Sequence, residues 1–490
     1  MFRKIINILI AFSFILLIGC AQSSKIDKSE VVDISQTLDR TKPPTPEEPK
    51  DVIFPKFKEA KLSNGLEVII VEDDANPIIS ISIISKGGSY YDGDKIGLSS
   101  ITSAMLNKGT TTRTAMQIAN ELDFLGSTLS SYTTSLSNYI GISTLKKNLN
   151  QTLDVFADCI LNSTFAEDEL QRVITQRIAT LRRNKTNPNS LADIEFTKII
   201  FGEHPFGNQV SGTEITLNAL TVSDLKTFYS KYVIPNNSYC MVSGDITLDE
   251  VVALLEEKLK DWKPAESHLI DKDDAEFPAT RRVVVVDRTG AVQSAIRVGF
   301  ASTNMARANT DNLKLNILNT YLGGFFGSRL NQKLREEKSY TYGAGSSIDA
   351  RLFSGVFTAS TQVGSEFTAP AVEDILDEID KLSTTPIPED KFKNVKDYVI
   401  GSFPIGIETS SRVANLLSDL KLYGLPLNYY DTYISSIKNM TVKDMQEMAQ
   451  KHIDASKLVI VISGDSKIIA PTLEKFGNVE IVDADGNPIE

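Results

Sequence analysis

Imidazole and thiol groups, which supply most metal ligands and many enzyme nucleophiles, are scarce in this chain. The three histidines are His204, His268 and His452. The three cysteines are Cys20, Cys159 and Cys240. No two histidines are close enough in sequence to form a local metal motif, and three cysteines cannot build a disulfide framework or a multi-thiolate site. We therefore interpret His204 as a structural loop residue and His452 as a structural helix-end residue.

Phosphate and nucleic acid are not expected ligands. Gly323, Gly324 and Gly327 are spaced closely enough to suggest a phosphate loop, but the Lys-Ser/Thr ending of such a loop is missing. These glycines are expected at a helix start or tight turn. The net charge of -12 repels phosphate backbones, and no long Lys/Arg run creates a local exception.

The N-terminus has the charge-then-hydrophobe order of a secretory signal, because Arg-Lys at 3–4 precedes an apolar run over 5–19. The run is short for a bilayer span. It ends in Leu-Ile-Gly-Cys at 17–20, which resembles the bacterial lipobox and implies a signal peptide over 1–19 and lipidation of Cys20. Ala-Gln after the cysteine, in place of aspartate, favours the outer membrane, facing the periplasm. An uncleaved anchor helix is the alternative.

The body of the chain is internally duplicated. Thr-Val-Ser-Asp at 221–224 recurs as Thr-Val-Lys-Asp at 441–444, and Ser-Gly-Asp at 243–245 recurs at 463–465. Both offsets are 220, since 441 − 221 and 463 − 243 are equal. In each copy the threonine is predicted to cap a helix whose first turn contains the aspartate, and a short strand follows.

Two homologous α+β domains are the predicted architecture. With 490 residues, 41% hydrophobic and 23% charged, the chain is long enough for two large domains. We expect a polar, Pro-rich tether over 20–55, domains over 56–262 and 281–490, and an exposed linker over 263–280. Each domain is predicted to be a mostly antiparallel sheet covered by helices. Each should open with paired strands, 66–71 with 78–84 and 283–286 with 294–300.

The segment at 97–110, together with His-Pro-Phe-Gly at 204–207, resembles the pitrilysin/insulinase-like zinc metallopeptidases, which include mitochondrial processing peptidase subunits. The resemblance covers the whole body after the tether. Active members carry His-x-x-Glu-His between the Gly-Leu and Met-Leu of this segment, where two imidazoles bind zinc and the glutamate is the base.

The resemblance places the wrong residue types at the metal site. Ser100 and Ala104 stand at the two His positions and Ser103 at the Glu position. The third ligand, a glutamate on a later helix, falls near 175–177, where Arg177 would repel a cation. No His-x-x-Glu-His occurs anywhere in the sequence. We therefore expect this chain to bind no metal and to be inactive alone.

The second half retains another part of the family pattern. Arg335 and Tyr342 match an Arg/Tyr pair that the family spaces by seven (342 − 335). By resemblance, this pair reaches the zinc site of the opposite domain, where it holds the substrate carbonyl and stabilises the oxyanion. A structural alternative is that Arg335 pairs with Glu336 or Glu337 on a surface helix, with Tyr342 in the following strand.

These features predict the non-catalytic subunit of a heterodimeric zinc metallopeptidase, with Arg335 and Tyr342 acting on the zinc site of a homologous partner that hydrolyses peptides. A catalytically dead peptide-binding or scaffolding lipoprotein of the cell envelope is the main alternative. A hydrolase with Ser100 or Ser103 as nucleophile has less support, because no His or Lys arrangement accompanies them.

Overall fold

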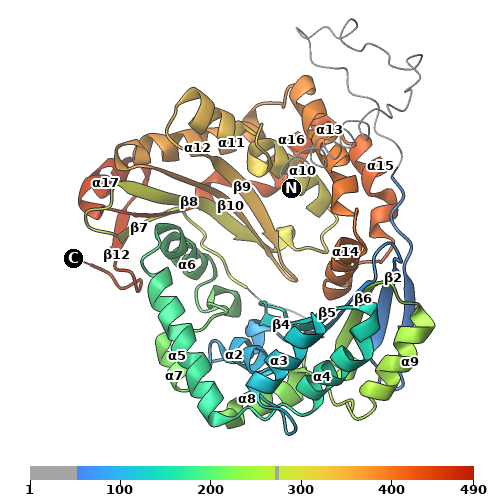
Figure 1. Ribbon diagram of the computed structural model, residues 1–490. Coiled ribbons are helices and arrows are strands. Elements are labelled where there is room, and N and C mark those ends of the chain that lie inside the picture. Colours follow the sequence, from blue (N-terminus) through green and yellow to red (C-terminus); the bar gives the residue numbers. More distant parts are fainter. Residues whose placement is uncertain (1–51, 271–274, 490) are drawn as a thin grey trace, which may run out of the picture. The chain divides into compact units, whose positions relative to one another are not determined.

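The computed structural model describes residues 52–270 and 275–489. The predicted signal peptide, Cys20 and most of the tether lie outside the described residues. The described residues form one compact unit, in which two six-stranded sheets pack against helices (Figure 1).

The first sheet has the order β1-β2-β6-β3-β5-β4. Its strands are β1 (Lys58–Lys61), β2 (Glu67–Glu72), β3 (Ile78–Lys86), β4 (Thr128–Thr133), β5 (Ser137–Leu145) and β6 (Ser238–Gly244). The helices of this half are α2 (Leu98–Met105), α3 (Ala115–Leu125), α4 (Leu149–Leu161), α5 (Glu167–Asn184), α6 (Pro188–Phe201), α7 (Glu214–Asn218), α8 (Val222–Tyr232) and α9 (Leu248–Lys258).

The second sheet has the order β12-β7-β11-β8-β10-β9. Its strands are β7 (Arg282–Asp287), β8 (Gln293–Ser302), β9 (Ala344–Ala350), β10 (Gly355–Gly364), β11 (Val459–Gly464) and β12 (Val479–Val482). The helices of this half are α10 (Asn312–Asn319), α11 (Arg329–Asn331), α12 (Thr368–Thr384), α13 (Glu389–Gly406), α14 (Ser410–Leu422), α15 (Tyr433–Lys438), α16 (Val442–His452) and α17 (Ser466–Leu473), with π-helical turns η7 (Thr320–Gly324) and η8 (Gln332–Glu337).

The two sheets share one topology, because β2-β6-β3-β5-β4 corresponds strand by strand to β7-β11-β8-β10-β9. Neighbouring strands of the described sheets are antiparallel except β2–β6, β7–β11 and β7–β12. The prediction of two homologous α+β domains with mostly antiparallel sheets is therefore confirmed.

The predicted pairing of the opening strands is wrong. β6 lies between β2 and β3, and β11 lies between β7 and β8. The last sheet strand of the first half thus inserts at the centre, where every one of its residues is buried. Hydrophobic alternation identifies which face of a strand is buried, but it does not identify the strand's neighbours.

The repeated Thr-x-x-Asp motif forms the same helix start in both halves, as predicted. In α8 the amide of Thr221 donates to Asp224 at 3.0 Å, and the amide of Asp224 donates to Thr221 Oγ1 at 3.3 Å. In α16 the equivalent distances between Thr441 and Asp444 are 2.9 and 3.2 Å. Each box satisfies amides that the first helical turn leaves without intrahelical partners.

One helix of each half packs against the sheet of the other half. In the first sheet Val68 and Ile70 face their own helices, whereas Ile69 and Val71 pack against α14 from the second half. In the second sheet Ile460 and Ile462 face their own helices, whereas Val459 and Val461 pack against α6 from the first half. Both faces of each central strand are consequently buried. Figure 1 shows α6 beside the second sheet and α14 beside the first.

Polar contacts fix the exchanged helices in place. Tyr239 of β6 donates its hydroxyl to the carbonyl of Ser418 in α14 at 3.0 Å. On the other side, the buried Arg297 of β8 pairs with Asp193 of α6 at 2.5 Å. Each sheet therefore makes a polar contact with the helix that the other half contributes.

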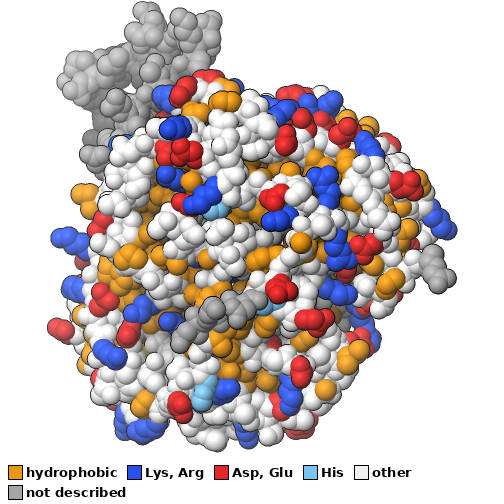
Figure 2. All heavy atoms as spheres, turned by 180° about the vertical axis from the view of Figure 1, so that it is seen from behind, with side chains coloured by type: hydrophobic (Ala, Val, Ile, Leu, Met, Phe, Trp, Pro, Cys, Tyr) orange, Lys and Arg blue, Asp and Glu red, His pale blue; other side chains and the backbone are white. Residues whose placement is uncertain are grey.

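Charged side chains of both signs are mixed on the described surface, and the expectation against nucleic-acid binding stays a prediction. On the face seen in Figure 2, Lys and Arg side chains are interspersed with Asp and Glu side chains. Within 52–270 and 275–489, no helix combines the length and apolar character that a membrane span needs.

Replacing Leu417 by alanine should lower the free energy of unfolding by about 2–5 kcal/mol, because this α14 side chain is fully buried against the first sheet. Denaturant unfolding followed by far-UV circular dichroism and by fluorescence of Trp262, a first-half residue, should show both signals shifting together. Asn415→Ala, exposed on the same helix, is the control and should change stability by less than about 0.5 kcal/mol. An unshifted Trp262 transition in Leu417→Ala would contradict the coupling.

Candidate functional site

The positions aligned with the zinc ligands lie around one cavity. Ser100 and Ala104 lie one turn apart on α2, Arg177 lies on α5, and all three line a cavity of about 320 Å³. The other lining residues are Ser131, Tyr132 and Thr133 of β4, with Val210 and Ser211 of the loop before α7. The alignment made from flanking residues therefore selected positions that the fold brings together.

The residues of this cavity do not fit a zinc ion. A serine hydroxyl and a methyl group stand where imidazoles would bind, and the guanidinium of Arg177 repels a cation. Ser103 is buried, and its hydroxyl lies 2.7 Å from Thr133 Oγ1 as part of the contact between α2 and β4. In the described part of the chain, no group of three or more His, Cys, Asp and Glu residues is arranged to hold a metal. That this chain binds no metal stays a prediction.

Asp92 positions the helix that carries Ser100 and Ala104. Its carboxylate accepts the amide of Gly97 at 2.8 Å and the amide of Ser99 at 2.9 Å, at the start of α2. Gly97 has φ 96°, and a Cβ there would come within 2.8 Å of Gly212, so the turn requires glycine. Burial raises the pKa of Asp92 to about 6, although these hydrogen bonds oppose the rise.

Neither His204 nor His452, the two histidines interpreted as structural, lines this cavity. His452 is buried at the end of α16, with Nε2 2.8 Å from Asp311 Oδ2. His204 accepts the amide of Phe206 at Nδ1 and lies against the ring of Phe206, with ring centroids 5.2 Å apart. These contacts agree with a packing role for both imidazoles.

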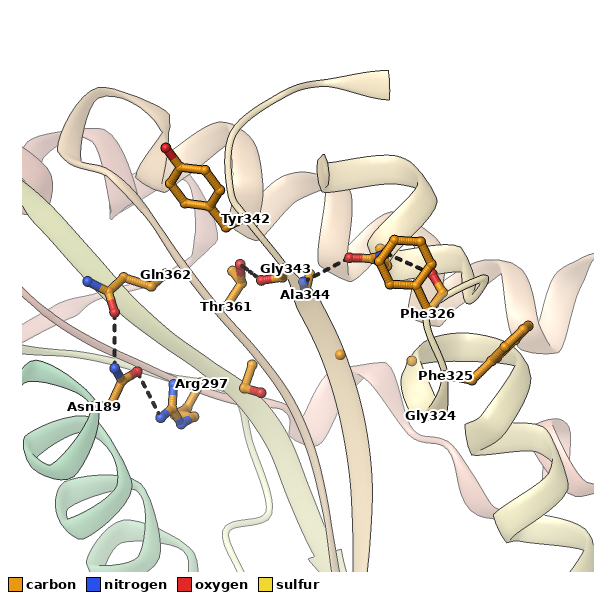
Figure 3. A pocket seen from close by; sticks show the side chains of 14 residues that line it. Asn189, Arg297, Gly324, Phe325, Phe326, Tyr342, Gly343, Ala344, Thr361 and Gln362 are labelled. Carbon is orange, nitrogen blue, oxygen red and sulfur yellow. Dashed lines mark hydrogen bonds between the residues drawn. The ribbon is translucent and has the colours of Figure 1, made fainter. Parts of the chain in front are cut away.

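Tyr342 lines a second cavity, of about 570 Å³ (Figure 3), in the second half. Its side chain is 97% exposed. Arg335, in η8, lies with its guanidinium 4.6 Å from the ring centroid of Phe326, which lines the same cavity, and 3.6 Å from Glu336. Arg335 itself is not among the lining residues. The two cavities share no lining residue, so the structure does not bring Tyr342 to the Ser100–Arg177 site.

The first half also contributes to the Tyr342 cavity, which the sequence analysis missed. Asn189 of α6 donates to Gln362 at 3.0 Å and accepts from Arg297 at 3.2 Å, as Figure 3 shows. The sequence contains one indication of this contribution, which is Arg297, the single charged residue in the largely apolar strand β8. A charge at this position predicts a polar partner for Arg297, but only the packing of α6 on the second sheet shows that α6 provides that partner.

Two family models match consecutive parts of the chain. Insulinase (Peptidase family M16) matches residues 67–214, and Peptidase M16 inactive domain matches residues 219–399. A Rickettsia felis protein, named as an uncharacterized zinc protease, is 30% identical over 67% of this chain and 78% of its own length. The Helicobacter pylori non-peptidase homolog YmxG is 23% identical over 82% of this chain and 92% of its own.

A solved structure shows the same fold. The peptidase M16 inactive domain from Pseudomonas fluorescens superposes with a TM-score of 0.77 and 23% identity, covering 84% of this chain and 98% of that one.

Introducing zinc ligands tests whether Arg177 alone keeps a cation out. The variant Ser100→His/Ala104→His should hold little zinc, whereas adding Arg177→Glu should give close to one zinc per chain, because two imidazoles and a carboxylate then face one cavity. Zinc is measured by elemental mass spectrometry after dialysis. The control replaces the exposed Arg183 of α5 by glutamate in the two-histidine background. Stoichiometric zinc while Arg177 is present would refute the role given to its charge.

Asp92 should make stability fall as pH rises. The folded pKa of about 6 exceeds the ordinary 3.8, so the folded chain binds this proton more tightly than the unfolded chain. The stabilisation is complete below about pH 4 and is lost as pH passes about 6, a change on the order of 2–3 kcal/mol.

Urea unfolding of wild type and Asp92→Asn from pH 4 to 7 measures this dependence. The stability of Asp92→Asn relative to wild type should increase over that range. The exposed neighbour Asp94→Asn serves as control. A pH-independent difference between wild type and Asp92→Asn would rule out the raised pKa.

Proposed function

Because this chain belongs to the insulinase family of peptidases (family M16) but carries no His-x-x-Glu-His motif, we propose that it is the non-catalytic subunit of a heterodimeric zinc metallopeptidase. In this proposal a homologous partner subunit holds the zinc and hydrolyses peptides. The observation that carries the proposal is an asymmetry: the metal positions are replaced, whereas Arg335 and Tyr342 keep the family spacing.

The surroundings of Arg335 and Tyr342 support a role outside this chain's own core. The phenol of Tyr342 is almost fully exposed beside a cavity, so it contributes little to packing. The pair between Arg335 and Glu336 is an exposed contact at 3.6 Å, and pairs of this kind contribute about 0–1 kcal/mol. Arg335 can therefore exchange its carboxylate for another acceptor at small cost.

The two side chains suit the chemistry of peptide hydrolysis. A guanidinium offers several N–H donors in a fixed plane, and a phenol offers one O–H donor. Donors aimed at a peptide carbonyl hold it in the ground state and stabilise the oxygen more strongly as negative charge develops on it. In the proposed subunit, Arg335 and Tyr342 supply these donors to a peptide in the partner's site.

We propose that the subunit is a lipoprotein, anchored through lipidated Cys20 to the outer membrane and facing the periplasm. The support is the sequence at 1–22, where a basic start, an apolar run and a lipobox-like ending follow one another. In this arrangement the predicted tether separates the folded body from the membrane, and it ends where Phe54 stacks on Tyr430 in the folded body.

A peptide-binding or scaffolding lipoprotein without any hydrolysis is the second candidate. The observation that favours it is Arg177. Its positive charge repels cations from the cavity, which replacement of the metal ligands by uncharged residues would not do. The two candidates differ in whether a zinc-carrying chain of the same family co-purifies with this one.

Affinity purification of the tagged full chain from membranes, with mass identification and zinc analysis of the complex, tests the partnership. We expect a homologous chain with His-x-x-Glu-His, about one zinc per pair, and chelator-sensitive cleavage of peptides. Recovery of this chain free of any such homologue would contradict the proposed subunit role.

Arg335→Ala and Tyr342→Phe should each lower kcat/KM of that complex at least about tenfold, since each removes a donor to the developing oxyanion. Lys338→Ala, an exposed change between the two positions, is the matched control and should leave kcat/KM unchanged. Unaltered peptide cleavage by both variants would refute their assigned roles.

A further inference from the structure

Arg177 lacks the polar partners that other partly buried arginines of the described chain have. Five arginines that are at most a third exposed each pair with a carboxylate: Arg113, Arg297, Arg307, Arg329 and Arg351. Arg281 and Arg288 have no carboxylate beside them, but each donates to a backbone carbonyl, of Ala455 and Thr186 respectively. Arg177 is half-buried, and within the described ranges it has neither an ion pair nor a side-chain hydrogen bond. Burial lowers its pKa, and no neighbouring acid offsets that effect. A desolvated, uncompensated cation is costly unless a ligand supplies the opposite charge.

The cavity around Arg177 provides donors for an anion. Arg177 is the sole charged residue among those that line it. The hydroxyls of Ser100 and Ser211 also line the cavity, and no hydrogen bond to another described residue engages them. Thr133 and Ser131, by contrast, donate to the carbonyls of Ser99 and Ser103. One guanidinium and two available hydroxyls therefore face a space of about 320 Å³.

The cavity also runs along a free strand edge. β4 ends its sheet and, among the described strands, pairs with β5 alone. Side chains alternate between the two faces of a strand, so a cavity lined by the consecutive residues Ser131, Tyr132 and Thr133 follows the strand's edge. Unpaired backbone groups at such an edge can bind an extended peptide.

We propose that this cavity is a carboxylate-binding site, in which Arg177 holds a carboxylate of an extended peptide lying along β4. A carboxylate matches the planar guanidinium fork with two parallel hydrogen bonds. The hydroxyls of Ser100 and Ser211 can then satisfy its remaining lone pairs. The position that the family uses for a cation has thus become a position for an anion. This site lies within one chain, and it is tested without a partner subunit.

Two sources of carboxylate, a chain terminus and an acidic side chain, share this chemistry. Four fluorescent hexapeptides of alternating Thr and Val distinguish them: one with a free C-terminus, one amidated, one amidated with a central Glu, and one amidated with a central Gln. Binding to the purified full chain is measured by anisotropy, with inorganic phosphate as competitor.

At least one acidic peptide should bind about tenfold or more tighter than its uncharged match, as a bidentate ionic contact provides. Arg177→Gln should abolish this preference and Arg177→Lys should reduce it. Arg183→Gln, an exposed change of equal charge on α5, should leave it intact. Equal binding of acidic and uncharged peptides by the wild type overturns the proposal. So does a preference that survives Arg177→Gln, or phosphate binding without any peptide preference. None of these results bears on whether a zinc-carrying partner exists.

Discussion

The central strands of both sheets carry apolar side chains on both faces. The helices of each half cover one face of its own sheet, and a helix from the other half covers the second face. β2 and β6 alternate between residues that face their own helices and residues that face α14, and β7 and β11 do the same toward their own helices and α6. Burial of apolar surface is the main favourable term in folding, so the exchanged helices stabilise the sheets that receive them. The cavity beside Tyr342 depends on this arrangement directly, because Asn189 of α6 lines it.

This fold tolerates other residue types at the positions aligned with the zinc ligands, because those residues line a cavity at the margin of the first core, against which only Ala104 partly packs. Ser100, Ala104 and Arg177 line a solvent cavity, whereas their helices are held by Ile101, Val173 and other buried apolar residues. Asp92 and the turn at Gly97 fix the start of α2 whether or not its side chains bind a metal. These contacts position α2 without any contribution from a metal.

The sequence predicted what local chemistry determines. Thr221 and Thr441 cap helices because the motif is complete within four residues, and the offset of 220 predicted two homologous domains. Flanking residues sufficed to place Ser100, Ala104 and Arg177 at one site. Strand order was beyond such reasoning, since insertion of β6 between β2 and β3 depends on contacts far apart in the chain. The same holds for Asn189, which reaches its cavity only because α6 packs on the other half's sheet.

Because the halves exchange helices, the segment between them is not the main contact that holds them together. Residues 263–270 are largely exposed, and the hydrogen bonds that Ala265, Ser267 and Ile270 make are all to the first half. The halves are held instead by two reciprocal interfaces, and the connection mainly keeps their local concentration high. In its packing the chain resembles two intertwined subunits joined in one polypeptide. Proteolytic cleavage in that exposed stretch would leave the two fragments associated, because each fragment keeps the helix that covers the other fragment's sheet.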